Sequence, residues 1–158
     1  MFGKLVAEPR LVAWAGELAY RYSGQTLQPK ARPRCLVGLW QQVEQHAGQK
    51  FNHVLINRYR DHNDAMGFHA DDEPELGRDP LICSVSLGAS RRFLLKPKRG
   101  VAAPGQARYS WCLEGGSLLT MGGSLQHYYR HAVPRQTRPS EPRINLTFRL
   151  LRRPPGST

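Results

Sequence analysis

The chain has 158 residues and a formal net charge of +11, with a pI of about 10.2. This length suits one domain with its own core, and a hydrophobic content of 40% excludes wholesale disorder. No apolar run approaches the roughly 20 residues that a membrane span needs, and we expect no secretory signal and no membrane partner. The charge favours a polyanionic partner such as nucleic acid, because cations near phosphates release counterions, although a merely soluble basic surface is the alternative.

The three cysteines, Cys35, Cys83 and Cys112, are too far apart for a Cys-x-x-Cys motif. We expect three reduced thiols, and therefore a reducing compartment such as the cytosol (a cytoplasmic location).

The first clear element is a helix predicted over residues 31–48. Pro33 suits a first turn, and Gly48 suits the C-terminal stop. Between them, apolar residues recur at helical spacing at Leu36, Leu39, Trp40 and Val43.

From Phe51 the period changes to two, which predicts a strand with Phe51, His53, Leu55, Asn57 and Tyr59 on one face. Further strands are expected at 81–87, 92–96, 109–113, 117–121, 126–129 and 143–150, separated by Gly and Pro. One helix followed by many short strands predicts a mostly β fold, a sandwich or jelly roll with a flanking N-terminal helix. We expect one domain over 1–151 and a flexible tail over 152–158.

The last predicted strand separates apolar from polar residues. Alternation places Ile144, Leu146, Phe148 and Leu150 on one face and Arg143, Asn145, Thr147 and Arg149 on the other. The polar face either meets solvent or lines a cavity. In a cavity, its two arginines would suit a carboxylate or phosphate group, because guanidinium binds such groups bidentately.

Seven of the twelve acidic residues lie between Asp61 and Asp79, which indicates either an exposed acidic loop or a cation site. Within this segment His69 and Asp71 share one side if the backbone is extended, and His127 and His131 are both candidates for a second histidine. Two histidines and a carboxylate suit iron(II) with three open positions, and also zinc with a bound water. The spacing alone leaves iron, zinc and no metal open.

Several segments together resemble one family. They are Leu-Ile-Asn-Arg-Tyr at 55–59, His-Ala-Asp-Asp-Glu at 69–73, Ser-Val-Ser-Leu-Gly at 84–88, His131, and Arg-Ile-Asn-Leu-Thr-Phe-Arg at 143–149. In this order the sequence resembles the AlkB family of Fe(II)- and 2-oxoglutarate-dependent nucleic-acid dealkylating dioxygenases, above all its animal members that act on duplex DNA. The resemblance implies a double-stranded β-helix, which is a jelly roll.

The resemblance also implies roles for individual residues. His69, Asp71 and His131 would ligate iron, whereas His127 matches no ligand and belongs on the surface or beside the ligands. The 2-oxoglutarate would be held by Asn57, Tyr59, Arg143, Thr147 and Arg149, with Asn145 nearby. The family's reaction consumes O2, converts 2-oxoglutarate to succinate and CO2, and hydroxylates the alkyl carbon, so that a methyl group leaves as formaldehyde.

For the substrate, the resemblance implies that Tyr22 stacks on a flipped base and that Tyr20 borders the pocket; two ordinary core tyrosines are the alternative. Phe2, with Lys4, would act as a wedge in duplex DNA, unless this end is merely disordered. Asp72 and Glu73 would face the substrate and favour adenine and cytosine lesions; otherwise they are solvated loop residues.

Basic stretches at 91–92, 96–99 and 135–138 are candidates for phosphate contacts. The expected function is oxidative demethylation of 1-methyladenine- and 3-methylcytosine-type bases in DNA, duplex or single-stranded, by a monomer. The alternatives are an oxygenase directed at RNA or protein, and a non-catalytic basic β-sandwich that binds nucleic acid.

Overall fold

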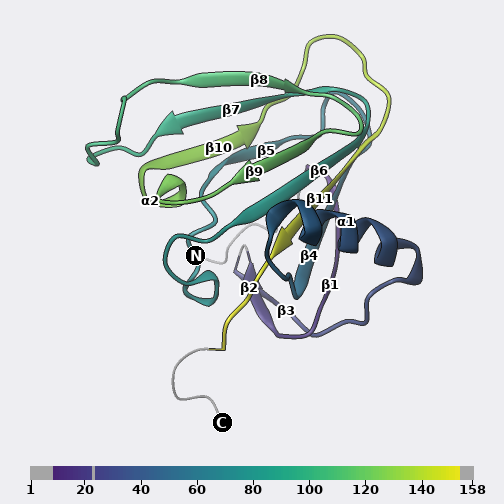
Figure 1. Ribbon diagram of the computed structural model, residues 1–158. Helices are drawn as coiled ribbons and strands as arrows, with labels where there is room; N and C mark the ends of the chain where they lie inside the picture. Colours follow the sequence, from purple (N-terminus) through teal and green to yellow (C-terminus); the bar gives the residue numbers. More distant parts are fainter. Residues whose placement is uncertain (1–8, 23, 154–158) are drawn as a thin grey trace, which may run out of the picture.

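Two antiparallel sheets face each other in the computed structural model, which describes residues 9–22 and 24–153 (Figure 1). The larger sheet has the order β1 (Leu11–Gly16), β4 (His53–Tyr59), β11 (Arg143–Arg149), β6 (Ile82–Gly88) and β9 (Leu118–Met121). The smaller sheet has the order β5 (Met66–His69), β10 (Tyr129–Val133), β7 (Arg91–Pro97) and β8 (Tyr109–Leu113). A separate hairpin joins β2 (Tyr20–Tyr22) to β3 (Gln25–Leu27). This arrangement confirms the predicted jelly roll with a flanking helix.

Strand β11 lies at the centre of the larger sheet, between β4 and β6. Its apolar residues Leu146 and Phe148 point into the core cluster beneath helix α1, as alternation predicted. The register pairs Asn145 with Asn57 and Arg143 with Tyr59, so that the polar residues of β11 and β4 share the opposite face. That face looks toward the smaller sheet.

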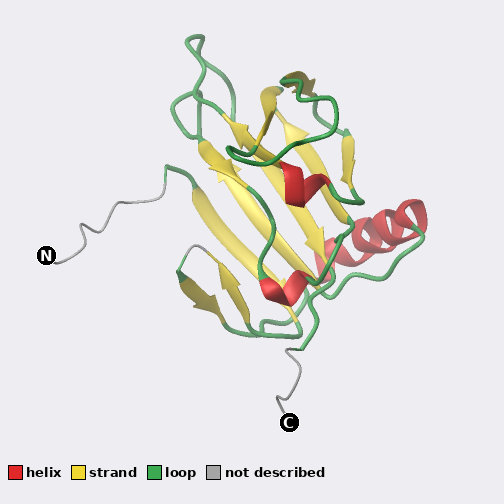
Figure 2. Ribbon diagram, turned by 90° about the vertical axis from the view of Figure 1, so that its left-hand side faces the viewer, coloured by secondary structure: helices red, strands yellow, loops and turns green. Residues whose placement is uncertain are grey.

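Helix α1 (Val37–Ala47) follows a 3-10 turn, η1 (Arg34–Leu36), and lies against the outer side of the larger sheet (Figure 2). The helix begins later than predicted, because Pro33 is extended, with φ −62° and ψ 136°. It ends as predicted at Gly48, whose φ of 63° is left-handed. With 11 residues it is the longest helix, and no helix among the described residues is long and apolar enough to cross a membrane.

The strand predicted over 126–129 is wrong. Residues Leu125–Tyr128 form a short helix, α2, and the strand β10 begins only at Tyr129. A tertiary contact fixes this turn, because the buried Gln126 side chain accepts a hydrogen bond of 3.0 Å from the Asp71 backbone N–H. Four residues are too few for hydrophobic periodicity to separate a helix from a strand.

Four short strands and one turn were not predicted: β1, β2, β3, β5 and the 3-10 turn η2 (Pro74–Leu76). The tail expected from residue 152 lies outside the described residues from 154 onward. Strand β5 matters most for the site, because it carries His69.

Glu44 joins helix α1 to the start of β4 and generates a prediction about stability. Its buried carboxylate accepts hydrogen bonds from Trp40 Nε1 (3.2 Å), the Phe51 backbone N–H (2.9 Å) and Lys50 Nζ (2.7 Å). Burial alone would raise the pKa of Glu44, but these donors lower it below its ordinary value. The carboxylate therefore stabilises the fold above the unfolded pKa, and this contribution is lost as the pH falls through the lower folded pKa.

We expect Glu44→Gln to lower the free energy of unfolding at pH 7 by about 1–3 kcal/mol, because a neutral amide replaces a charged acceptor. Urea denaturation from pH 7 to pH 3 measures it, and the difference from the wild type should shrink below about pH 4.5. Glu114→Gln, at an exposed position, is the control and should change little. A difference that is constant over the whole pH range would contradict this role of the charge.

Candidate metal centre and co-substrate pocket

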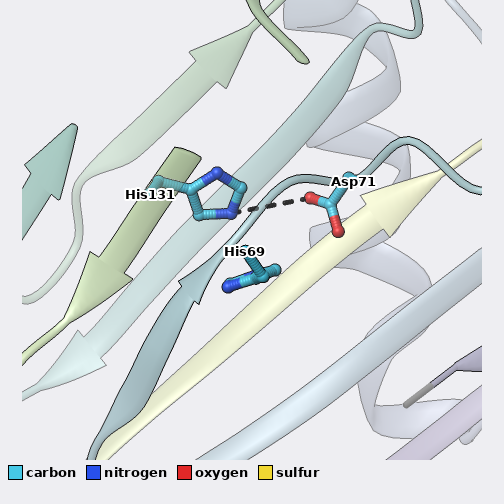
Figure 3. Close-up of side chains that lie close together, drawn as sticks. All are labelled: His69, Asp71 and His131. Atoms are coloured by element: carbon cyan, nitrogen blue, oxygen red, sulfur yellow. Dashed lines mark ion pairs between the residues drawn. The ribbon is translucent and has the colours of Figure 1, made fainter. Parts of the chain in front are cut away.

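Strand pairing brings His69, Asp71 and His131 together (Figure 3). His69 ends β5 and pairs directly with His131 in β10, and the two ring centroids are 4.2 Å apart. Asp71 follows His69 by two residues, and one potential ligand atom from each residue lies within 4.8 Å of the others. Asp71 is 1% exposed and His131 is 6% exposed, whereas His69 is half-buried.

The protonation states of the cluster suit a cation. Burial alone would raise the pKa of Asp71, but Arg149, His131 and His69 lower it to about 2. Burial lowers the pKa of His131 to about 4 and also lowers the pKa of His69. At neutral pH the cluster is therefore one carboxylate and two neutral imidazoles, which are the forms that bind metal ions.

The hydrogen bonds leave ligand atoms free. His69 Nδ1 donates to the Gly67 carbonyl at 2.9 Å, since a carbonyl can only accept, and its Nε2 therefore keeps a lone pair. Asp71 Oδ1 accepts from Arg149 Nη2 at 2.8 Å, whereas Oδ2 is buried without a donor among the described residues. That Oδ2 lies 3.8 Å from His131 Nε2. Two ligand atoms that each lie about 2.1 Å from one ion are about 3 to 4 Å apart, so the spacing fits a shared metal ion.

A cavity with about 440 Å³ of empty space, which continues to solvent, lies between the sheets beside this cluster. The polar face of β11 lines it, because Arg143, Asn145, Thr147 and Arg149 are all part of its wall. These four side chains are at most 7% exposed, which rules out plain solvent exposure of this face. The remaining lining residues are Tyr22, Leu55, Asn57, Tyr59, Met66, His69, Asp71, Ser84, Phe93, Leu113, Met121, His131 and Val133.

Arg143 carries a buried positive charge with no carboxylate partner among the described residues. It is 1% exposed, its Nη2 donates to Ser86 Oγ at 2.9 Å, and its Nε and Nη1 have no acceptor in the described part of the chain. Burial accordingly lowers its pKa. A buried guanidinium with two free N–H groups calls for an anionic ligand, and a carboxylate is the planar partner that it fits.

Arg149 has a double role in the cavity wall. Burial alone would lower its pKa, but the ionised Asp71 raises it, so the guanidinium stays charged. Its Nη2 fixes Asp71, and its Nε and Nη1 have no partner among the residues described. Asn145 and Thr147, in contrast, form hydrogen bonds within the protein. Thr147 Oγ1 donates to Asn145 Oδ1 at 2.9 Å, and Asn145 Nδ2 donates to Ser84 Oγ at 2.6 Å.

One residue of this site, Arg10, was missed by the sequence analysis. Its side chain is 5% exposed and donates to Asn57 Oδ1 at 2.7 Å and to Tyr22 Oη at 3.1 Å. Arg10 therefore links Asn57, which is expected to bind the co-substrate, to Tyr22, which is expected to stack on the flipped nucleobase. The pattern before β1 gave no signal for it, because one arginine in a basic chain is not distinctive.

The residues expected at the substrate lie in different settings. Tyr22 lines the cavity, but Tyr20 is 0% exposed and packs edge-on against His53 at 5.0 Å, so it does not border the cavity. Asp72 pairs with Lys98 Nζ at 2.7 Å on the surface, and Glu73 is half-buried. Phe2 and Lys4, expected as a wedge, lie outside the described residues.

Two further expectations concern charged surface groups. His127 lies on the surface, where its Nε2 is 2.9 Å from Asp79 Oδ1, and it takes no part in the cluster. Arg91 was expected to contact phosphate, which is wrong: it is 1% exposed and donates to the carbonyls of Asp61, Asp64 and Pro134. Its neighbour Arg92 is exposed.

The cluster generates a prediction about metal binding. We expect His69→Ala and His131→Ala each to weaken Fe(II) binding by about 100-fold or more, because each removes one of three ligands. Anaerobic titration calorimetry measures this, and circular dichroism checks the fold. His127→Ala is the matched control, four positions from His131, and should bind as the wild type does. Equal losses in all three variants would speak against the cluster.

Comparisons with known proteins agree with this geometry. Residues 4–149 match the family described as the 2OG-Fe(II) oxygenase superfamily. The chain is 42% identical over 149 residues to the Bos taurus "Alpha-ketoglutarate-dependent dioxygenase alkB homolog 3", covering 91% of this chain and 52% of that protein. It is 40% identical over 156 residues to the Homo sapiens "DNA oxidative demethylase ALKBH2", covering 96% and 60% respectively.

The chain thus spans little more than half the length of these curated relatives. A solved structure described as "The structure of OsALKBH1" has the same fold, with a TM-score of 0.60 and 21% identity over 94% of this chain and 83% of that chain. The chain belongs to the 2OG-Fe(II) oxygenase superfamily, and its relatives there are AlkB-type proteins.

Proposed function

We propose that this chain is an Fe(II)- and 2-oxoglutarate-dependent dioxygenase that removes methyl groups from N-alkylated bases in DNA, of the 1-methyladenine and 3-methylcytosine type. One observation carries the proposal: a largely buried His-Asp-His cluster shares a cavity with two buried arginines whose Nε and Nη1 have no acceptor among the described residues. We assign the whole activity to one domain over 1–151.

Family membership implies Fe(II), 2-oxoglutarate and O2 as the reagents. When bound, iron would activate O2 for hydroxylation of the N-methyl carbon, with 2-oxoglutarate supplying two electrons as it becomes succinate and CO2, after which formaldehyde would leave and the base would be restored. His69, Asp71 and His131 would hold the metal. Arg149 orients Asp71 through its 2.8 Å hydrogen bond and leaves Oδ2 free for the ion.

The remaining wall would position the two organic reactants. Arg143 would bind a carboxylate of 2-oxoglutarate through Nε and Nη1, which have no protein acceptor among the described residues. Asn57 and Tyr59 lie beside it across the β4–β11 register, with Asn145 and Thr147 in the same wall. Apolar side chains of the smaller sheet on the other side, including Phe93, Leu113 and Val133, would keep water from the reacting carbon.

The substrate class rests on charge and relatives. The net charge of +11 suits a phosphate backbone, and the curated relatives are named as an alkB homolog and as a DNA oxidative demethylase. Tyr22 lines the cavity and would stack on the flipped base. Asp72 and Glu73 would accept hydrogen bonds from an exocyclic amino group, which adenine and cytosine carry.

The test is formaldehyde and succinate release from oligonucleotides that carry 1-methyladenine or 3-methylcytosine, with Fe(II), 2-oxoglutarate and O2. Single-stranded DNA, duplex DNA, RNA and a methylated peptide are compared, so that a preference for RNA or protein becomes visible. Asp71→Ala should abolish both products. If the folded, iron-loaded wild type releases neither product from any substrate, the proposal is wrong.

Arg143 generates a separate prediction. We expect Arg143→Gln to raise the KM for 2-oxoglutarate about 30-fold or more and to change kcat less, because a buried charge pair with the co-substrate is lost. Steady-state succinate production measures both constants. Arg92→Gln, which changes an exposed arginine on strand β7 of the smaller sheet, is the control. An unchanged KM in Arg143→Gln would remove this residue from the co-substrate site.

A further inference from the structure

Two exposed aromatic rings lie side by side on strand β8. This strand forms one edge of the smaller sheet (Figure 1). Tyr109 is 42% exposed and Trp111 is 44% exposed. Their ring centroids are 5.6 Å apart and their planes differ by only 6°, so the two rings are stacked in parallel. The other exposed large hydrophobic residues of the described chain are aliphatic: Leu11, Val37, Leu87, Val101, Leu118 and Ile144.

The pair lies on the same face of the sheet as the metal cluster. The register pairs Trp111 with Phe93 and Tyr109 with Leu95, and Phe93 lines the cavity and stacks on His131 at 5.4 Å. Leu95 also pairs with His131 on its other side. Tyr109 is therefore level with His131 and two strand spacings away, a distance of about 10 Å.

Packing within the fold uses only part of these two side chains. Trp111 and Tyr109 contact Phe93 and Tyr129 at 6.2 Å and 6.3 Å between centroids, yet more than a third of each side chain remains accessible. Isolated exposed apolar residues are ordinary, whereas a stacked aromatic pair beside a catalytic cavity is a binding surface.

An exposed cationic residue, Arg108, directly precedes Tyr109. A second exposed arginine, Arg92, pairs with Cys112 on the neighbouring strand and lies on the opposite face of the sheet. The acidic residue of this stretch, Glu114, lies beyond the end of β8. Aromatic rings beside a cationic residue, in a chain of net charge +11, match the bases and phosphates of a nucleic acid strand.

We propose that Tyr109 and Trp111 form a stacking platform for the unpaired bases next to the base that enters the cavity, and that the chain therefore prefers an unpaired strand. This inference rests on the proposed function. A base in a duplex has both faces covered by its neighbours, and cannot offer a face to the platform. An unpaired base can, and stacking on aromatic side chains is tolerant of sequence because every base has a π face.

Binding measurements test the platform without catalysis. Fluorescence anisotropy gives the Kd of the wild type and of Trp111→Ala, Tyr109→Ala and the double variant for labelled, unmethylated single-stranded and duplex DNA. We expect the double variant to bind single strands about tenfold or more weakly and duplex as the wild type does. Val37→Ala, also 44% exposed but on helix α1, is the matched control and should alter neither Kd.

A second measurement locates the stacked bases. An abasic nucleotide on the 5′ or on the 3′ side of the methylated base should weaken binding to the wild type as much as the double substitution does. Combining the abasic oligonucleotide with the double variant should weaken binding no further. Trp111→Phe should retain single-strand binding while removing most of the tryptophan quenching caused by the oligonucleotide. Additive losses at both flanks would overturn the proposal.

The remaining outcomes are distinct. Equal weakening of single-strand and duplex binding in the double variant, or no weakening, overturns the platform. A wild-type dimer that becomes monomeric in Trp111→Ala with unchanged DNA binding also overturns it, because the pair then contacts a second copy. If the wild type releases no formaldehyde while platform-dependent binding holds, the proposed activity fails and the platform stands. If the double variant demethylates single strands normally and at an unchanged KM, the proposed activity stands and the platform is overturned.

Discussion

The site depends on a single buried ion pair, between Asp71 and Arg149. The two side chains are 1% and 2% exposed, and their sequence positions are 78 residues apart. Removing either partner would leave an unpaired charge inside the jelly roll, which is strongly destabilising. The pair holds Asp71 by one oxygen only, so the other oxygen is left facing His131. A structural contact thereby presents a metal ligand in a fixed orientation.

The charges in the cavity wall explain why metal and co-substrate belong together. Its charged residues are Asp71, Arg143 and Arg149, since His69 and His131 are neutral at pH 7, and their net charge is +1. A divalent cation alone would raise the buried charge, and a dicarboxylate alone would reverse its sign. The two together leave it unchanged, which is the least costly way to fill a site of low dielectric constant.

Sequence patterns predicted the parts of this site that follow strand periodicity. Alternation in residues 143–150 separated Leu146 and Phe148 from the polar face, and the structure confirms the division. Whether that face met solvent could not be decided from one strand, because the answer depends on a second sheet packed opposite it. The helix α2 and the contacts of Arg10 escaped prediction for the same reason: each is fixed by partners distant in sequence, Asp71 for Gln126 and Asn57 for Arg10.

Contacts in the interior of the site are buried and fixed, whereas contacts at its surface can be exchanged. Asp71 is fixed by a buried hydrogen bond to Arg149, whereas Asp72, the next residue in the motif, pairs with Lys98 at the surface. An ion pair with a half-exposed carboxylate contributes about 0–1 kcal/mol. In the proposed function, Asp72 would therefore exchange Lys98 for a substrate amino group at little cost, and Lys98 would then be free to contact a phosphate. Tyr109 and Trp111 on the edge strand are likewise only partly packed, as the proposed platform for many different sequences would require.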